Sequence, residues 1–127
     1  MIMIYTAFIY TILMSAVIIF QLCLTLGLPW GAASMGGKFP GKYPTKMRFV
    51  SFFNMILLSF MTMIVLIKAD LILPQFKSTS HFAIWFVVVF SITAVILNTI
   101  TKSKIERNIW APVTAIQFIC VLIVAFN

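Results

Sequence analysis

Four long stretches of this chain carry no charged side chain, and they decide what the chain can fold into. They are residues 1–37, 49–67, 78–101 and 108–127. A helix rises about 1.5 Å per residue, so about 20 apolar residues cross a hydrocarbon core about 30 Å thick. We therefore predict an all-α fold, a polytopic membrane protein built as a four-transmembrane-helix bundle. The expected helices lie near residues 4–26, 49–67, 82–99 and 110–126.

The composition excludes most other classes of protein. Of the 127 residues, 63% are hydrophobic and 9% are charged, whereas an ordinary soluble domain has about 25% charged residues. So few charges cannot cover the exterior of a soluble globular domain, and they also exclude a disordered chain and a coiled coil. We expect residues 1–127 to form a single domain.

Two alternatives apply to single segments. The β-branched run at residues 86–90 would suit a buried strand, but strands of 18 or more residues are rare, and a transmembrane barrel needs alternating polar residues. The first apolar stretch could be a signal peptide, with small residues at 31–34 mimicking a cleavage site. That stretch is too long, however, and no basic residue precedes it.

Basic residues are distributed unevenly among the loops, which predicts an orientation. The first and third loops together carry seven Lys or Arg residues, whereas the second loop carries two, Lys68 and Lys77. Positive loops face the cytoplasm. We therefore expect a multi-pass protein of the cell membrane with both termini outside and the first and third loops in the cytoplasm. Trp30 and Trp110 fall at the cytoplasmic boundary, where they would act as interfacial anchors.

The first loop contains all five glycines and three of the five prolines. One interpretation is a long turn in which the glycines supply positive φ and the prolines add stiffness. The other is an anion site, in which backbone N–H groups converge on a phosphate of a lipid head group. Basic side chains would then supply the charge contacts. The candidates are Lys38, Lys42, Lys46, Arg48 and Arg107.

Two motifs carry a resemblance. The sequence Leu26-Gly27-x-Pro29-Trp30-Gly31, followed by Gly-Gly, Pro-Gly, Pro and Arg, and the later Glu106-Arg107-x-x-Trp110-x-Pro112-Val113 stand in the first and third loops. The pattern resembles small four-helix bacterial integral membrane proteins without an assigned activity. The resemblance covers the two loops and the four-span layout. It implies that the two motifs belong together, and it brings no activity with it.

Four amide side chains lie within or at the ends of the predicted spans. Counted along helices, all four come within about 11 Å of the cytoplasmic surface. They are Gln21, Asn54, Asn98 and Gln117. One interpretation is interhelical hydrogen bonding that fixes the bundle. The other is a polar vestibule open to the cytoplasm, roofed by the glycine-proline loop and bordered by Glu106 and Arg107.

The sequence offers little for catalysis, metals or redox chemistry. Cys23 and Cys120 are the only cysteines, and whether they pair stays open. His81 is the only histidine, and one histidine cannot build a metal site. We expect no metal and no cofactor. Distant residues can converge in a fold, so an enzymatic role stays open although no motif indicates one.

Three classes of function remain. The first is a non-enzymatic interaction protein or complex subunit whose basic cytoplasmic face contacts anionic lipid head groups. The second is a small transporter or channel subunit with a polar vestibule, although the predicted spans lack the ionisable groups that proton-coupled carriers need. The third is a lipid-modifying enzyme. The expected partners are the lipid bilayer and either a second copy of the chain or another membrane protein. Anionic lipid explains the net charge of +7 without a nucleic-acid partner.

Overall fold

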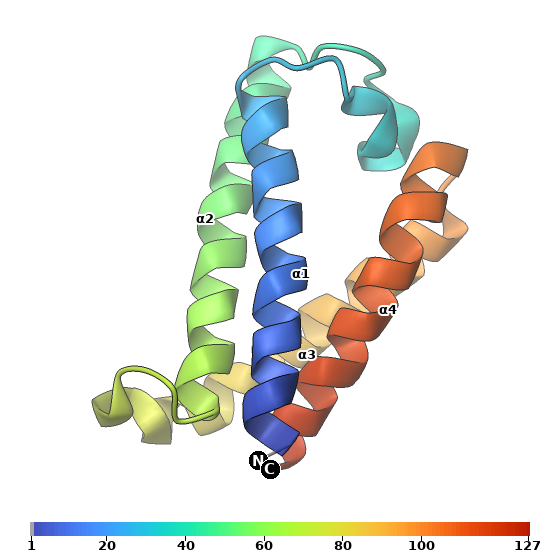
Figure 1. Ribbon diagram of the computed structural model, residues 1–127. Coiled ribbons are helices and arrows are strands. Elements are labelled where there is room, and N and C mark those ends of the chain that lie inside the picture. Colours follow the sequence, from blue (N-terminus) through green and yellow to red (C-terminus); the bar gives the residue numbers. More distant parts are fainter. Residues whose placement is uncertain (1) are drawn as a thin grey trace.

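The computed structural model describes residues 2–127, which form four long helices (Figure 1). The helices are α1 (Ile2–Thr25), α2 (Thr45–Lys68), α3 (Lys77–Ile100) and α4 (Lys104–Phe126). Each is long and apolar enough to cross a membrane, so the predicted all-α fold with four spans is confirmed. Three short 3₁₀ turns lie in the loops. They are η1 (Gly31–Ala33), η2 (Met35–Gly37) and η3 (Pro74–Phe76).

Three of the helices begin several residues before the predicted apolar spans, because their first turns are polar. The side chain of Ser103 caps α4 by accepting a hydrogen bond of 3.2 Å from the backbone N–H of Glu106. Glu106 and Arg107, which we expected in a loop, therefore belong to the first turns of α4. Lys68, also expected in a loop, is the last residue of α2.

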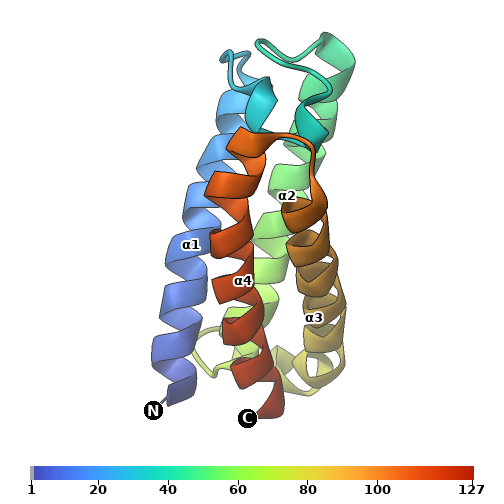
Figure 2. The same ribbon diagram turned by 90° about the vertical axis from the view of Figure 1, so that its right-hand side faces the viewer.

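The helices follow one another around the bundle. Neighbours in sequence pack together, and α4 closes the ring against α1. Figures 1 and 2 show both termini at one end of the bundle, which we call the terminal end. The opposite end, called the loop end, carries loop 1–2 (residues 26–44) and the short connection between α3 and α4 (residues 101–103).

The main apolar core lies toward the terminal end. Its members come from all four helices and include Tyr10, Met61, Ile84 and Val121, each with almost no exposed surface. Toward the loop end, α4 and α3 lean away from α1 and α2 (Figure 1). Only a small second cluster of Leu24, Tyr43 and Met47 lies there. The bundle is therefore tight at one end and splayed at the other.

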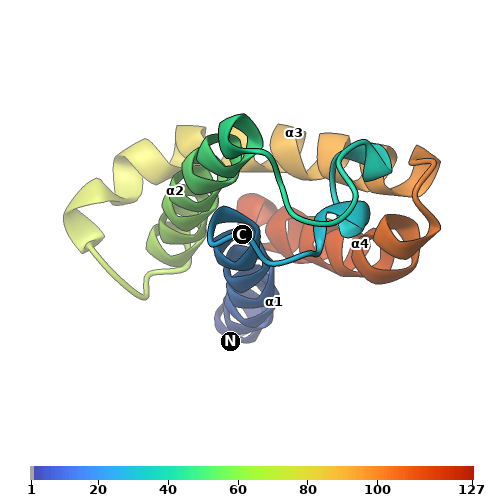
Figure 3. The same ribbon diagram turned by 90° about the horizontal axis from the view of Figure 1, so that it is seen from above.

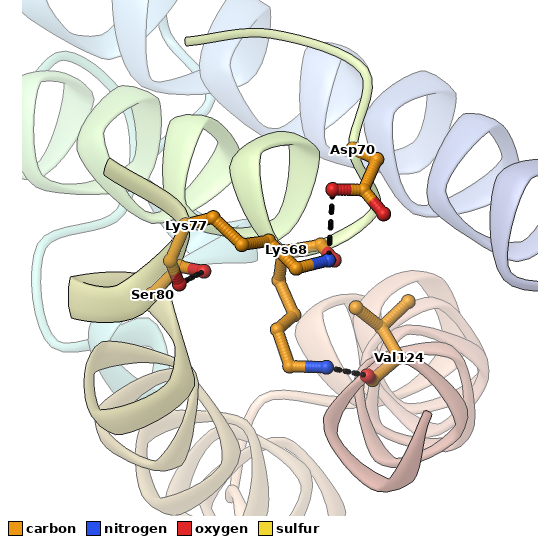
Figure 4. A network of polar contacts seen from close by, with 5 residues as sticks. All are labelled: Lys68, Asp70, Lys77, Ser80 and Val124. Carbon is orange, nitrogen blue, oxygen red and sulfur yellow. Dashed lines mark hydrogen bonds and ion pairs between the residues drawn. The ribbon is translucent and has the colours of Figure 1, made fainter. Parts of the chain in front are cut away.

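A buried lysine joins two helices at the terminal end (Figure 4). Lys68 is 2% exposed, and its Nζ donates a hydrogen bond of 3.1 Å to the backbone oxygen of Val124, in the last turn of α4. A cation suits this position, because the final carbonyls of a helix carry partial negative charge. Lys77 donates to the backbone oxygen of Lys68 and forms an ion pair with Asp70 at 2.9 Å. This network fixes the end of α2 against α4.

Helix α4 contains a proline, and neither cysteine of the chain is in a disulfide. Pro112 stands inside α4, where proline cannot donate a backbone hydrogen bond to the preceding turn. Cys23 and Cys120 are both free thiols.

Candidate functional site

A cavity of about 700 Å³ occupies the splayed loop end of the bundle. All four long helices contribute to its wall, and Tyr10, Met14 and Met61 border it on the side of the apolar core. Residues 33–36, 38 and 39 of loop 1–2 complete its lining, and we call them the roof. Most of the lining is apolar, with a few polar side chains, which is the usual character of a small-molecule site.

The roof is docked on the beginning of α4, as seen from above in Figure 3. Trp110 Nε1 donates a hydrogen bond of 3.0 Å to the backbone oxygen of Ala33. Ser103 Oγ donates to the backbone oxygen of Ala32, and the N–H of Gly36 donates to Glu106 Oε2 at 3.3 Å. The two motifs at residues 26–48 and 106–113 are therefore in direct contact.

Close backbone packing also shapes loop 1–2. The N–H of Gly31 donates a hydrogen bond of 2.9 Å to the oxygen of Gly41. A Cβ atom on Gly31 would lie 1.9 Å from the oxygen of Phe39. Glycine is therefore required at this position, where two parts of the loop cross.

The cavity has a lateral opening beside α3. Thr93, Leu97 and Ile100 line the cavity and are also exposed, Leu97 by 58% and Ile100 by 68%. On the opposite side, the rings of Phe20 on α1 and Trp110 on α4 lie 4.9 Å apart and close the gap between those helices. The opening therefore faces the surroundings of α3, which for a membrane-spanning bundle are lipid.

All four amide side chains singled out in the sequence line this cavity, one on each helix. They do not bond to one another within residues 2–127. Gln117 Nε2 lies 3.9 Å from the sulfur of Met14, and Asn98 Nδ2 donates to the oxygen of Ala94 in its own helix. The Oε1 atom of Gln21 is buried and, within residues 2–127, accepts no hydrogen bond. The amides thus line a shared space rather than forming an amide-to-amide network.

Glu106 is a buried carboxylate on the cavity wall, with 7% of its surface exposed. The spacing of Ser103 and Glu106 is that of a capping box, in which the glutamate carboxylate normally accepts from the backbone N–H of the serine. Here the N–H of Ser103 donates to Thr101 Oγ1 at 3.2 Å instead, and the carboxylate points to the roof. The described part of the chain gives Glu106 no ion pair.

Aromatic rings line the same cavity as Glu106. Phe20, Phe39 and Trp110 line it, and Trp30 stacks on Phe20 outside the cavity at 6.5 Å. Tyr43 lies close by in loop 1–2. Burial raises the pKa of the Tyr43 hydroxyl, the Ser34 side chain lowers it, and the negative charge of Glu106 raises it further.

The basic residues proposed as anion contacts do not converge on one point. Lys38 lines the cavity at the roof, whereas Lys42 and Lys46 are exposed outside it. Arg48 Nε donates to the oxygen of Thr25 at 2.8 Å, and an amino group of Arg107 donates to the oxygen of Thr101 at 3.1 Å. The two arginines therefore fasten loop ends. Arg107, expected beside the vestibule, is not among the lining residues.

Sequence reasoning treated Glu106 only as a border residue. The capping-box spacing from Ser103 to Glu106 was visible and would have placed Glu106 in the first turn of a helix. Its burial could not be read from spacing, because burial depends on where the roof docks.

Comparison with protein-family models, with curated proteins and with solved structures gives no match for this chain. The fold itself defines the class: a multi-pass integral membrane protein with four spans in a helical bundle. Its spans contact the lipid bilayer. The main candidate for a functional site is the cavity that lies under the roof and opens beside α3.

Proposed function

We propose that this protein is a non-enzymatic membrane protein that binds an amphipathic, lipid-like molecule in the cavity at its loop end. The observation that carries the proposal is the combination of a lateral opening beside α3 with a few polar side chains in an otherwise apolar lining. A molecule from the bilayer would enter with its chain against the apolar wall. Its polar end would lie among the amides, Glu106 and the roof.

The size and chemistry of the cavity support binding. A volume of about 700 Å³ lies within the range of about 300–1,000 Å³ typical of sites for small molecules. Gln21 and Tyr10 each present a buried oxygen that lacks a hydrogen-bond partner within residues 2–127. Such groups normally have partners, so a bound molecule with donor groups would satisfy them.

The packed terminal end favours binding over conduction. Directly beyond Tyr10 and Met61, the core residues Ile84, Val87 and Val121 have at most a trace of exposed surface. A conducting path would have to pass through this core. A transporter subunit remains the second candidate, because the four amides face a common space as the vestibule hypothesis requires.

The proposal includes an orientation and a lipid preference. Loop 1–2 and the start of α4 would face the cytoplasm, with Lys38, Lys42 and Lys46 in contact with anionic head groups. The exposure of these lysines in loop 1–2 and at the start of α2 supports such contact. A second copy or another membrane protein could share this surface as a complex partner.

The test is to fill the cavity from α3. Ala94 lines the cavity, so Ala94→Phe should reduce the amount of co-purified lipid that native mass spectrometry detects on the protein. Ile96→Phe is the matched control, because Ile96 is exposed on the same helix and is not a lining residue. Equal lipid retention by both variants would contradict the proposal. The same spectra report the oligomeric state and any bound partner protein.

A further inference from the structure

We infer that the cavity recognises an ammonium group, carried on an amphipathic molecule, through the carboxylate of Glu106 and the aromatic rings beside it. The inference rests on the proposed binding function and names the chemical class of its ligand. It depends on three observations, which are the surroundings of Glu106, the unsatisfied acceptors of the wall and the aromatic side chains.

The carboxylate of Glu106 is buried, and no cationic side chain within residues 2–127 is paired with it. It is one of only two acidic residues in the chain. Gly36 N–H, at 3.3 Å, is its one hydrogen-bond donor within residues 2–127, and no basic side chain there pairs with it. Buried charges are normally paired, because transferring an isolated carboxylate out of water is costly. A cation from a ligand would supply the missing partner.

Two other polar groups of the wall also lack a partner, one an amide oxygen that can only accept and the other a hydroxyl that can donate or accept. Gln21 Oε1 and the Tyr10 hydroxyl oxygen are buried and, in the described chain, have no hydrogen-bond partner. Both residues line the cavity. The carboxylate and the Gln21 amide oxygen are acceptors, so a ligand that brings N–H donors fits the cavity better than one that brings only acceptors, such as a free phosphate.

The aromatic rings suit a cation. Phe20 and Trp110 lie 4.9 Å apart and both line the cavity, as does Phe39. Ammonium and quaternary ammonium groups are attracted to the faces of such rings, most strongly to Trp. Rings and a carboxylate together are the combination that recognises these groups.

Lys38 indicates where the rest of the head group would lie. It lines the cavity from the roof while remaining exposed at the surface. A phosphate next to the ammonium group could contact Lys38, as in the zwitterionic head group of phosphatidylethanolamine. A simple alkylammonium ion carries the same ammonium chemistry without the phosphate, and the experiment separates these two sources.

The experiment measures binding to the whole protein, purified in dodecyl maltoside, whose head group carries no charge. Four probes are added separately: phosphatidylethanolamine, phosphatidylglycerol and diacylglycerol with the same acyl chains, and dodecylammonium. Native mass spectrometry gives the affinity for each. Glu106→Gln keeps an oxygen that can accept from Gly36 and removes the charge. Asp70→Asn is the matched control, because it removes the other acidic charge, which is 63% exposed at the terminal end.

Glu106→Gln should weaken phosphatidylethanolamine binding about tenfold or more, the change expected when one charge-assisted contact is lost. Phosphatidylglycerol and diacylglycerol should be unaffected, and Asp70→Asn should behave as wild type. If dodecylammonium shows the same loss, the ammonium group alone is recognised; if it does not bind, the ligand is the zwitterionic phospholipid.

Unchanged phosphatidylethanolamine binding by Glu106→Gln would overturn the inference. So would wild-type protein that binds diacylglycerol as tightly as phosphatidylethanolamine, although amphiphile binding itself would then stand. If wild type binds none of the probes, the proposed function fails too. Should Glu106→Gln not fold, as judged by its circular dichroism melting curve, Phe20→Leu is measured instead. It should weaken binding of the two ammonium probes several-fold and spare diacylglycerol, and equal effects on all probes would overturn the inference.

Discussion

Trp110 Nε1, in the second turn of α4, donates a hydrogen bond of 3.0 Å to the backbone oxygen of Ala33 in loop 1–2. The two residues are 77 positions apart in the sequence. This contact holds the roof over the cavity, because Ala33 is both a buried residue and a lining residue. The indole ring itself forms part of the wall, so one side chain both supports the roof and borders the site.

Trp110→Phe should therefore loosen the roof while leaving most of the wall in place. The lost hydrogen bond leaves the Ala33 oxygen without its donor and should lower the free energy of unfolding by about 1–2 kcal/mol. Thermal melting in detergent measures the change. Trp85→Phe is the control, because the Trp85 ring packs against Phe126 at the other end of the bundle. A larger loss for Trp85→Phe would contradict the assignment.

Gly31→Ala should disrupt loop 1–2. Its Cβ atom would lie 1.9 Å from the oxygen of Phe39 and 2.7 Å from that of Gly41. The two backbone segments of the loop that cross here would therefore have to move apart. We expect a loss of about 3 kcal/mol or more in the free energy of unfolding. Gly41→Ala is the comparison, because its φ of +77° is strained but its Cβ would meet no atom within 4 Å. It should cost only about 1–2 kcal/mol. Equal melting temperatures for the two variants would refute this account.

Lys68→Met should destabilise the terminal end. The variant loses the hydrogen bond from Nζ to the Val124 oxygen. Hydrogen bonds from charged groups contribute about 1.5–3 kcal/mol to the free energy of unfolding. Part of this loss is offset, because the variant no longer buries a charge. Asp70→Asn breaks an ion pair whose aspartate is 63% exposed and should cost less than about 1 kcal/mol. Melting curves of the two variants give the comparison. If the Lys68→Met protein melts above wild type, the desolvation cost of the buried lysine exceeds the stabilisation from its hydrogen bond to Val124.

How far the sequence predicts this molecule can be seen from particular residues. The charge-free runs were sufficient for four helices, because a bilayer core admits little else. The positions of Gln21, Asn54, Asn98 and Gln117 along their helices were enough to place them at one end. Helix spacing does not reveal that α3 and α4 lean away there, since that depends on packing at the opposite end. Lys68 was assigned to a loop because a charge usually ends a span, and its partner, the Val124 oxygen, is a backbone atom that no sequence pattern marks.

The exposed lysines near the loop end should set the lipid preference. Replacing Lys38, Lys42 and Lys46 together by Gln should weaken retention of phosphatidylglycerol by about 3 kcal/mol at low salt, if each contributes about 1 kcal/mol and the contributions add. Native mass spectrometry at two salt concentrations checks this. The difference between variant and wild type should shrink at high salt. A variant with unchanged retention at low salt would exclude these lysines as lipid contacts.

The orientation can be measured by fusions at Asn127. With the basic loops in the cytoplasm, alkaline phosphatase fused there should be active, and a green fluorescent protein should be dark if exported unfolded through the general secretion pathway. The opposite pattern would place the C-terminus in the cytoplasm and reverse the proposed orientation. Fusions within the connection between α2 and α3 (residues 69–76), which lies at the terminal end, should match the result at Asn127.

We expect Pro112 to limit how deeply α4 lies in a bilayer. Because proline has no N–H, the carbonyl of Asn108 receives no bond from position 112, and an unpaired carbonyl is costly in hydrocarbon. We therefore expect the first two turns of α4 to stay at the depth of head groups and water, where water can bond to this carbonyl. Those turns carry Glu106 and Trp110. At that depth, the polar end of the cavity would be level with the membrane surface.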